Sequence, residues 1–383
     1  MKELLQFGAG KIGRSLCGAL FARAGYEVVF VDVDDRVIDA LNTHGRYRVI
    51  VKDNVPDEFM IERVRAVRAT DADAVINEVA KADIVSTAVG AGALEALIAP
   101  LAQGVVSRGG RPLDILLCEN LRNAADFVRS RLEEKLPPGR AAEFPAGLVE
   151  TSIGKMVPIM PAEVVEEDPL VVWAEAYNQI IADRQGFTQE PPAVEGLVTR
   201  DNFKAYVDRK LFVHNLGHAA CAYLGFLEGH ELIWQAMESD VLRETALGAM
   251  RESGQALLSF YHGEWTAEEM EDHIQDLARR FRNRALGDSV YRVGRDLPRK
   301  LAPDDRLIGA LRFQVDAGVE PIHTMRAIAA ALRFRAGDEK GDLFGADAQF
   351  AAFVEERGAR AALAEYAGLD TEGADRDLCD RIL

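Results

Sequence analysis

The chain has 383 residues, enough for two domains with substantial cores, and its 48% hydrophobic and 28% charged residues are ordinary for a folded protein. Its net charge of −17, without a block of basic residues, argues against a nucleic-acid partner. No apolar run approaches the roughly 20 residues of a membrane span, so we expect neither a membrane segment nor a signal peptide. The cysteines Cys17, Cys118, Cys221 and Cys379 form no CxxC pair, which is typical of buried free thiols in a reducing cytoplasm.

A glycine-rich turn lies near the start of the chain. A strand is expected to run into Phe7-Gly-Ala-Gly-Lys-Ile-Gly13, and a helix to follow from Arg14 to Ala24. Strand, Gly-x-Gly-x-x-Gly turn and helix in this order form the dinucleotide-binding fingerprint. In it Gly8 permits the tight turn, Gly10 lets the backbone approach the pyrophosphate, and Gly13 brings helix and strand together. The predicted cofactor contacts of the turn are Gly8, Ala9, Gly10, Lys11, Ile12 and Gly13.

An acidic residue ends the second predicted strand, Glu27–Asp32. In this fold a carboxylate at that position accepts hydrogen bonds from the adenosine ribose and repels a 2′-phosphate. No arginine follows directly, although Arg36 lies one helical turn further on. The sequence therefore favours NAD over NADP as the cofactor.

The next segments predict more strands of the same sheet. Residues Tyr47 to Ala69 alternate in polarity and predict an inserted hairpin or edge strands, and buried strands are expected at Ala82–Gly90 and Leu113–Asn120. Ligands of open α/β sheets bind beyond the carboxyl ends of the strands, which is where Glu119 and Asn120 lie. Asn120 is also a candidate helix cap.

Loops and linkers separate this region from a helical one. Pro137-Pro-Gly139 predicts a loop, Gly147–Pro158 the last strands, and Gln189–Pro192 a linker. Amphipathic helices follow with few strand signals, which is typical of a helical bundle. We therefore predict an α/β Rossmann-type doubly wound sheet over residues 1–195 and a mainly α-helical domain over residues 196–383.

Three polar residues lie close together in the first predicted helix of the second domain. In the run Lys-Leu-Phe-Val-His-Asn-Leu-Gly-His, an α-helix of ~100° per residue places Lys210, Asn215 and His218 on one face. Burial disfavours an ammonium, so a lysine there can lose its proton, and the amide and imidazole can hold an alcohol or carbonyl oxygen. The alternative is a solvated lysine and a satisfied core histidine.

Two other patterns occur in the same helix. Tyr206 precedes the lysine with the Tyr-x-x-x-Lys spacing of short-chain dehydrogenases, and we interpret it as a packing residue. His214 and His218 are spaced like zinc ligands, but no glutamate follows the first histidine, and His230 or Glu231 would have to complete the site. We therefore predict no metal site.

A basic loop lies further along the helical region. The segment Tyr291–Leu301 contains Arg292, Arg295, Arg299 and Lys300. Salt bridges to the many acidic residues would account for these cations. Guanidinium groups also bind phosphate oxygens bidentately, so the loop is a candidate anion pocket.

These motifs resemble the polyol-specific long-chain dehydrogenases, the mannitol dehydrogenase family, over essentially the whole chain. The resemblance is carried by Lys-x-x-x-x-Asn-x-x-His at 210–218, Cys-Glu-Asn at 118–120 and Arg-Val-Gly-Arg…Arg-Lys-Leu at 292–301. The site residues that it implies are the base Lys210, the oxygen-binding Asn120 and Asn215, the hydroxyl-binding His218, the phosphate-binding Arg295, Arg299 and Lys300, and the nucleotide-binding Asp32, Thr87, Ala88, Val89, Glu119 and Asn120.

The activity that the resemblance implies is metal-free hydride transfer between NAD and a polyol phosphate, most closely mannitol 1-phosphate and fructose 6-phosphate. We expect a cytoplasmic monomer or small homo-oligomer that acts on a small molecule. Gly154-Lys155 stands where the family has Asp-Arg, which leaves open a sugar-acid (altronate or mannonate) or non-phosphorylated polyol substrate. A non-catalytic NAD-binding sensor and a zinc hydrolase are the alternatives from other classes.

Overall fold

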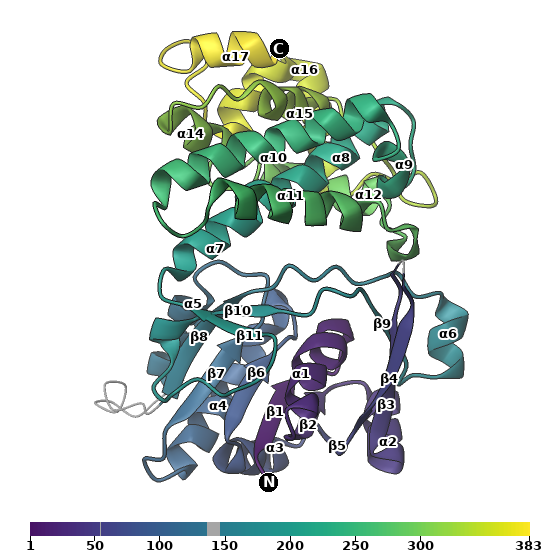
Figure 1. Cartoon of the computed structure of the whole chain (residues 1–383), viewed down its shortest axis with the longest axis vertical. Coiled ribbons are helices and arrows are strands. Elements are labelled where there is room, and N and C mark those ends of the chain that lie inside the picture. Colours follow the sequence, from purple (N-terminus) through teal and green to yellow (C-terminus); the bar gives the residue numbers. More distant parts are fainter. Residues whose placement is uncertain (54, 136–145) are drawn as a thin grey trace. The chain divides into compact units, whose positions relative to one another are not determined.

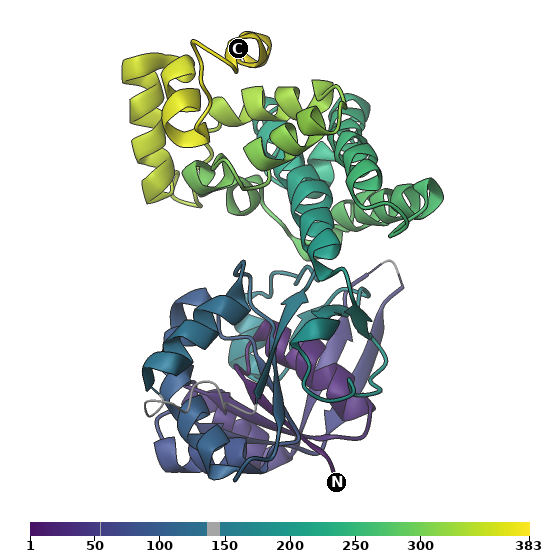
Figure 2. The same cartoon turned by 90° about the vertical axis from the view of Figure 1, so that its left-hand side faces the viewer.

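The computed structural model describes residues 1–53, 55–135 and 146–383, so the loop predicted at 137–139 lies outside the described residues. The chain divides into two compact units, Met1–Phe203 and Lys204–Leu383, each drawn in Figures 1 and 2. Strand β11 (Leu197–Arg200), which follows the predicted boundary at residue 195, belongs to the sheet of the first unit.

A mostly parallel sheet forms the centre of the first unit (Figure 1). Among the described residues its strand order is β11-β10-β8-β7-β6-β1-β2-β5, and only β8 and β10 pair antiparallel. This is the doubly wound arrangement that the sequence predicts. The strands are β1 (Glu3–Phe7), β2 (Glu27–Asp32), β5 (Val64–Arg68), β6 (Ile84–Thr87), β7 (Leu113–Leu117), β8 (Ala146–Ser152) and β10 (Ile180–Asp183).

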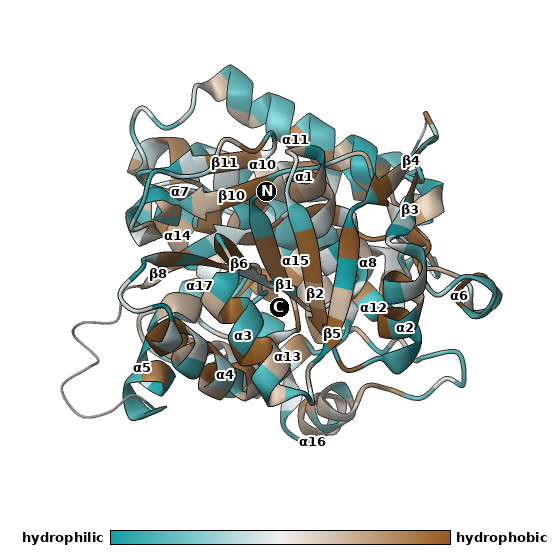
Figure 3. Ribbon diagram, turned by 90° about the horizontal axis from the view of Figure 1, so that it is seen from below, coloured by the Kyte–Doolittle hydropathy of each residue, from teal (hydrophilic) through white to brown (hydrophobic). Residues whose placement is uncertain are grey.

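Helices cover both faces of this sheet. Successive side chains of a strand point to opposite faces, so Val28 and Phe30 belong to one hydrophobic core and Val29 and Val31 to the other. A strand buried on both sides needs an almost continuous apolar run, and β2 is coloured accordingly in Figure 3. One core packs on η1 (Gly13–Gly18), α1 (Ala19–Arg23) and α2 (Asp35–His44), and the other on α3 (Ala72–Lys81), α4 (Leu94–Ser107) and α5 (Ala124–Lys135).

A hairpin is inserted between α2 and β5, which confirms the prediction for Tyr47 to Ala69. Strands β3 (Arg46–Val51) and β4 (Asp57–Glu62) pair antiparallel, and β9 (Val172–Ala174) adds to β3 in parallel. The short helix α6 (Ala162–Glu167) precedes β9. The buried Tyr47 donates a hydrogen bond to the carbonyl oxygen of Arg14 at 2.7 Å, which anchors the hairpin to the helix after the glycine turn.

The second unit is helical, as predicted. Its centre is α8 (Leu216–Leu227), whose residues are mostly buried because it packs against α9, α10, α12 and α15. The other elements are α7 (Phe203–Arg209), η5 (Lys210–Asn215), α9 (Ile233–Ala236), α10 (Asp240–Phe260), α11 (Ala267–Phe281), α12 (Val290–Gly294), α13 (Leu297–Lys300), α14 (Ile308–Asp316), α15 (Ile322–Leu332), α16 (Gly345–Ala367) and α17 (Arg376–Ile382). None of the helices in the described ranges combines the length and the apolar character that crossing a membrane requires.

Candidate active site

The glycine turn directly follows β1. Gly8 has a φ of +91°, and a Cβ there would lie 2.4 Å from the carbonyl oxygen of Ala88. A Cβ on Gly13 would lie 1.9 Å from the carbonyl oxygen of Gly8, so only glycine allows this close approach. A Cβ on the exposed Gly10 would instead have no atom within 4 Å. The open space at Gly10 fits the pyrophosphate of a dinucleotide.

The helix after the turn begins differently from the prediction. The helix begins with an α-helical turn at Lys11 and Ile12, continues as the π-helix η1 over Gly13–Gly18, and returns to α-helix at Ala19. The predicted cofactor contacts Lys11 and Ile12 are thus the first helical residues, the first exposed and the second half-buried. The apolar spacing predicts a helix here but does not distinguish hydrogen bonds to the fourth residue from bonds to the fifth.

Asp32 ends β2 beside the glycine turn. One carboxylate oxygen accepts a hydrogen bond from the N–H of Ala9 at 2.5 Å, and the other accepts from Val33 at 2.7 Å and Asp34 at 3.0 Å. Three backbone donors thus orient the carboxylate predicted to bind the ribose. Arg36, which would favour NADP, donates to a backbone carbonyl of α6 at 3.5 Å.

Glu119 joins two loops at the same edge of the sheet. Its carboxylate accepts hydrogen bonds from the N–H of Val89 at 2.9 Å and of Gly90 at 2.8 Å, one on each oxygen. The buried Glu119 therefore shapes the loop after Thr87, and its predicted contact with the cofactor stays a prediction. Asn120 follows it and is exposed.

Lys210 begins a second π-helix, η5, between α7 and α8. The predicted regular α-helix would separate Lys210 from Asn215 by about 140°. A π-helix instead joins residues five apart, so these two half-buried residues lie on the same side. Burial and then the charge of Arg306 lower the pKa of Lys210 from 10.5 to about 8. Lys210 is therefore not the solvated lysine of the alternative interpretation.

His218 lies on α8 in a polar cluster. Its ring stacks on Phe281 with centroids 4.8 Å apart, and its Nε2 lies 3.3 Å from an oxygen of the buried Asp288. Asp288 also forms an ion pair with Arg292. Burial, followed by the charges of Arg292 and Lys300, lowers the pKa of His218 to about 3. A neutral imidazole carries one donor and one acceptor, which suits a substrate hydroxyl.

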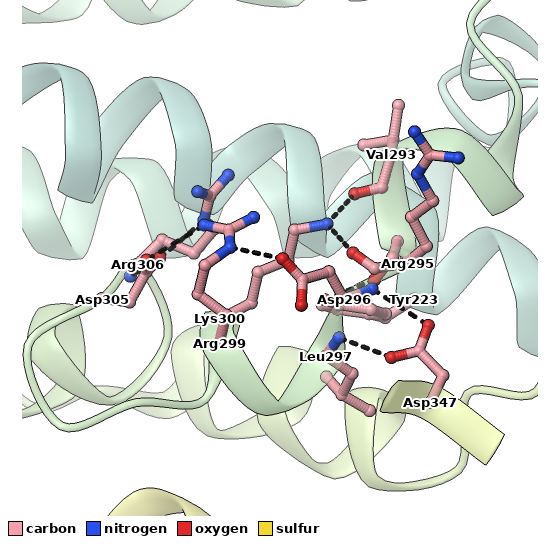
Figure 4. A network of polar contacts seen from close by, with 11 residues as sticks. Tyr223, Val293, Arg295, Asp296, Leu297, Arg299, Lys300, Asp305, Arg306 and Asp347 are labelled. Carbon is pink, nitrogen blue, oxygen red and sulfur yellow. Dashed lines mark hydrogen bonds and ion pairs between the residues drawn. The ribbon is translucent and has the colours of Figure 1, made fainter. Parts of the chain in front are cut away.

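Lys300, a predicted phosphate ligand, is bound to the protein backbone. Its Nζ donates to the carbonyl oxygen of Val293 at 2.7 Å and to that of Arg295 (Figure 4). Burial, then the charges of Arg306 and Arg299, lower the pKa of Lys300 to about 7. This lysine therefore stabilises the backbone of the basic loop.

Carboxylates stabilise the turn at Asp296, between α12 and α13. Asp296 adopts a left-handed φ of +66°, which is uncommon outside glycine and costs energy. Asp347 compensates by accepting hydrogen bonds from the N–H groups of Asp296 at 3.0 Å and Leu297 at 2.6 Å. Arg299 forms ion pairs with Asp296 and Asp305.

The remaining predicted phosphate ligand, Arg295, is exposed. Its guanidinium lies 5.7 Å from the ring centroids of both Tyr291 and Phe344. Sequence reasoning missed Arg306, whose charge lowers the pKa of Lys210 and His218. No motif pointed to Arg306, because an arginine after two aspartates is typical of a surface ion pair.

The two alternative patterns in the first helix have structural explanations. Tyr206 packs edge-to-face on Trp265 with ring centroids 5.0 Å apart. His214 is buried, and its ring lies 5.7 Å from that of Phe281. Within residues 1–53, 55–135 and 146–383 no three His, Cys, Asp or Glu residues form a group suited to a metal ion.

Lys155, where the sequence departs from the family pattern, holds a loop of the first unit. Its Nζ donates to the carbonyl oxygens of Glu175 at 3.1 Å and Tyr177 at 2.7 Å. The carboxylate of Glu175 in turn accepts from the N–H of Met156. Lys155 therefore has a structural role in the segment after β9.

We expect acid to destabilise the second unit through His214, His218 and His273. Burial lowers the pKa of all three, to about 3 for His218 and His273. Since an unfolded histidine has a pKa of about 6.5, the unfolded chain binds more protons below that pH. Stability is then lost as the pH falls from about 6.5 to 5, by roughly 1.4 kcal/mol per pH unit for each histidine.

Melting temperatures between pH 7 and 5 measure this effect. His273→Gln should make the dependence about one-third shallower, whereas the exposed His262→Gln should leave it unchanged. A melting temperature independent of pH in this range would contradict the prediction.

Comparison with known proteins gives the same fold. A D-sorbitol dehydrogenase structure superposes with a TM-score of 0.81 at 17% identity, covering 99% of this chain and 91% of that one. Pseudomonas fluorescens mannitol 2-dehydrogenase, in a ternary complex with NAD and D-mannitol, superposes with a TM-score of 0.75 at 17% identity, covering 100% and 89%. In sequence, the chain is 35% identical to Bacillus licheniformis mannitol-1-phosphate 5-dehydrogenase over 374 residues, 96% of each chain.

The doubly wound sheet with its glycine turn, joined to a helical unit with a half-buried lysine, defines a dinucleotide-dependent dehydrogenase. The chain belongs to the mannitol dehydrogenase family, whose Rossmann domain matches residues 2–196 and whose C-terminal domain matches residues 202–370. It is therefore an NAD-dependent polyol dehydrogenase.

Proposed function

We propose that the protein interconverts mannitol 1-phosphate and fructose 6-phosphate with NAD, using Lys210 as the base. The observation that carries the proposal is a half-buried amine on η5 with a pKa of about 8. General acid–base catalysis works best when the pKa of the base is near the working pH. The 35% identity to a mannitol-1-phosphate 5-dehydrogenase supports this choice of substrate.

The proposed mechanism assigns one task to each polar side chain. NAD, when bound, supplies the hydride acceptor. In the oxidation direction Nζ of Lys210 takes the proton of the reacting hydroxyl, and in the reduction direction the ammonium returns it. The amide of Asn215 donates to the oxygen on which charge develops, which is worth about 3–4 kcal/mol in comparable sites. Neutral His218 binds a neighbouring hydroxyl. Asn120 stays a predicted second donor.

A sugar acid or a neutral polyol is the alternative substrate. The cations of the basic loop also suit a carboxylate, and Lys155 replaces the residues that the family pattern has at that position. An oxidoreductase for altronate, mannonate or an unphosphorylated polyol would keep the same base. Only the preference among substrates separates these possibilities.

The experiment is an NADH-oxidation assay with fructose 6-phosphate, fructose, tagaturonate and fructuronate. We expect kcat/KM for fructose 6-phosphate to exceed that for fructose by about 100-fold or more, because two charge-assisted hydrogen bonds to a phosphate are worth at least about 3 kcal/mol. Activity should survive EDTA, since an amine is the proposed base. Equal rates with fructose, or faster rates with a keto acid, would contradict the proposal. A protein that binds NADH but oxidises it with no sugar would be a sensor.

A further inference from the structure

Arg306 is held along one edge of its guanidinium. Its backbone N–H and its Nε donate to the same oxygen of Asp305, at 2.6 and 2.8 Å. Its two terminal nitrogens have no hydrogen-bond partner in the described part of the chain. The side chain is only 13% exposed. Arg306 therefore presents a fixed, largely dehydrated pair of N–H donors.

The packing of α14 places this arginine near the proposed base. The ring of Phe212 in η5 lies 5.2 Å from that of Phe313 in α14. A Cβ on Gly309, at the start of α14, would lie 3.1 Å from Phe212, so the helix is pressed against the π-turn. Arg306 lies just before this contact, and its charge acts on Lys210. An anion bound by Arg306 would thus be anchored close to the reacting group.

Two neighbouring cations, Lys300 and Arg299, each interact with two acceptor groups of the protein. Lys300 donates to two backbone carbonyls, and Arg299 pairs with two carboxylates (Figure 4). Arg299 and Arg306 share Asp305, and Arg299 also pairs with Asp296. Residues 291–306 contain five Arg or Lys residues and three Asp residues, a local excess of positive charge in a chain of net charge −17. Such an excess, with an open guanidinium fork, suits a phosphate ester.

We propose that Arg306 binds the phosphate group of the substrate and sets the preference for phosphorylated over neutral sugars. The inference rests on the proposed function and names the residue responsible for its specificity. Lys300 then acts by shaping the basic loop, and the exposed Arg295 contributes less than the sequence suggested.

The test compares Arg306→Gln, Arg306→Lys and Arg295→Gln with the wild type in NADH oxidation at pH 6.5. At this pH Lys210 is protonated in each protein, so its pKa does not influence the comparison. Arg306→Gln should raise KM for fructose 6-phosphate by roughly 10- to 100-fold and leave kcat/KM for fructose within about threefold. Arg306→Lys, which keeps the charge but not the fork, should also raise KM for the phosphate ester. The exposed Arg333→Gln is the matched control.

Competition by inorganic phosphate gives a second measurement. Phosphate should inhibit the wild type competitively against fructose 6-phosphate, and roughly tenfold more weakly after Arg306→Gln. An equal loss of activity with fructose and fructose 6-phosphate, or a larger effect of Arg295→Gln, would overturn the inference while the proposed function stands. A wild type that does not reduce fructose 6-phosphate would overturn the proposed function and the inference with it.

Discussion

Replacing Lys210 with methionine is expected to lower kcat by about 10²- to 10⁴-fold, the usual contribution of a general base. Methionine keeps the length and apolar stem of lysine, so the half-buried position on η5 stays filled. The affinity for NADH should change little, because the glycine turn lies in the other unit. Steady-state rates in both directions, with NADH binding followed by fluorescence, measure the two effects separately.

The pH dependence of the two reaction rates tests whether Lys210 is the base. Only the neutral amine accepts a proton, so polyol oxidation should rise with pH up to the pKa of Lys210, about 8, and then level off. Ketose reduction needs the ammonium and should fall above the same pH. Both changes should disappear in Lys210→Met and persist in the exposed Lys340→Met. A near-normal rate or an unchanged profile in Lys210→Met would remove this residue from the mechanism.

Replacing Gly13 with alanine is expected to abolish NAD-dependent activity. The added methyl group would lie 1.9 Å from the carbonyl oxygen of Gly8, so η1 would have to move away from the turn. We expect the NADH dissociation constant to rise by about 100-fold or more, with a lower melting temperature, because strained backbone contacts of this kind are among the most destabilising.

Gly10→Ala separates cofactor binding from folding. The methyl group there meets no protein atom within 4 Å, so the melting temperature should stay that of the wild type. The space it fills is the one predicted for the pyrophosphate, so the NADH affinity should still fall by about tenfold or more. Gly345→Ala, also free of close contacts, serves as the control. Unchanged NADH affinity in Gly10→Ala would place the cofactor elsewhere.

The general architecture could be predicted because its signals are local. Continuous apolar runs such as β2 mark strands buried on both faces, and glycines at fixed spacing mark the turn after β1. The alternation after Tyr47 predicts the hairpin. The four residues of β11 were harder to find, since they carry a weak strand pattern after a proline-rich linker.

The candidate site was only partly predictable. Lys210, Asn215 and His218 could be found because a short motif contains them all. Arg306 could not, because its position beside η5 depends on the packing of Phe212 against α14, nearly one hundred residues further along the chain. The role of Lys155 depends likewise on carbonyls of a loop that the sequence does not mark.

The two π-helices have a consequence for the tolerance of this enzyme to change in chain length. A π-turn corresponds to an α-helix with one residue inserted. Deleting a single residue from Lys210–Asn215 would therefore yield a regular helix, but it would remove the five-residue spacing that brings Lys210 and Asn215 to the same side. Homologues that share this segment should thus keep its length even where its apolar side chains differ.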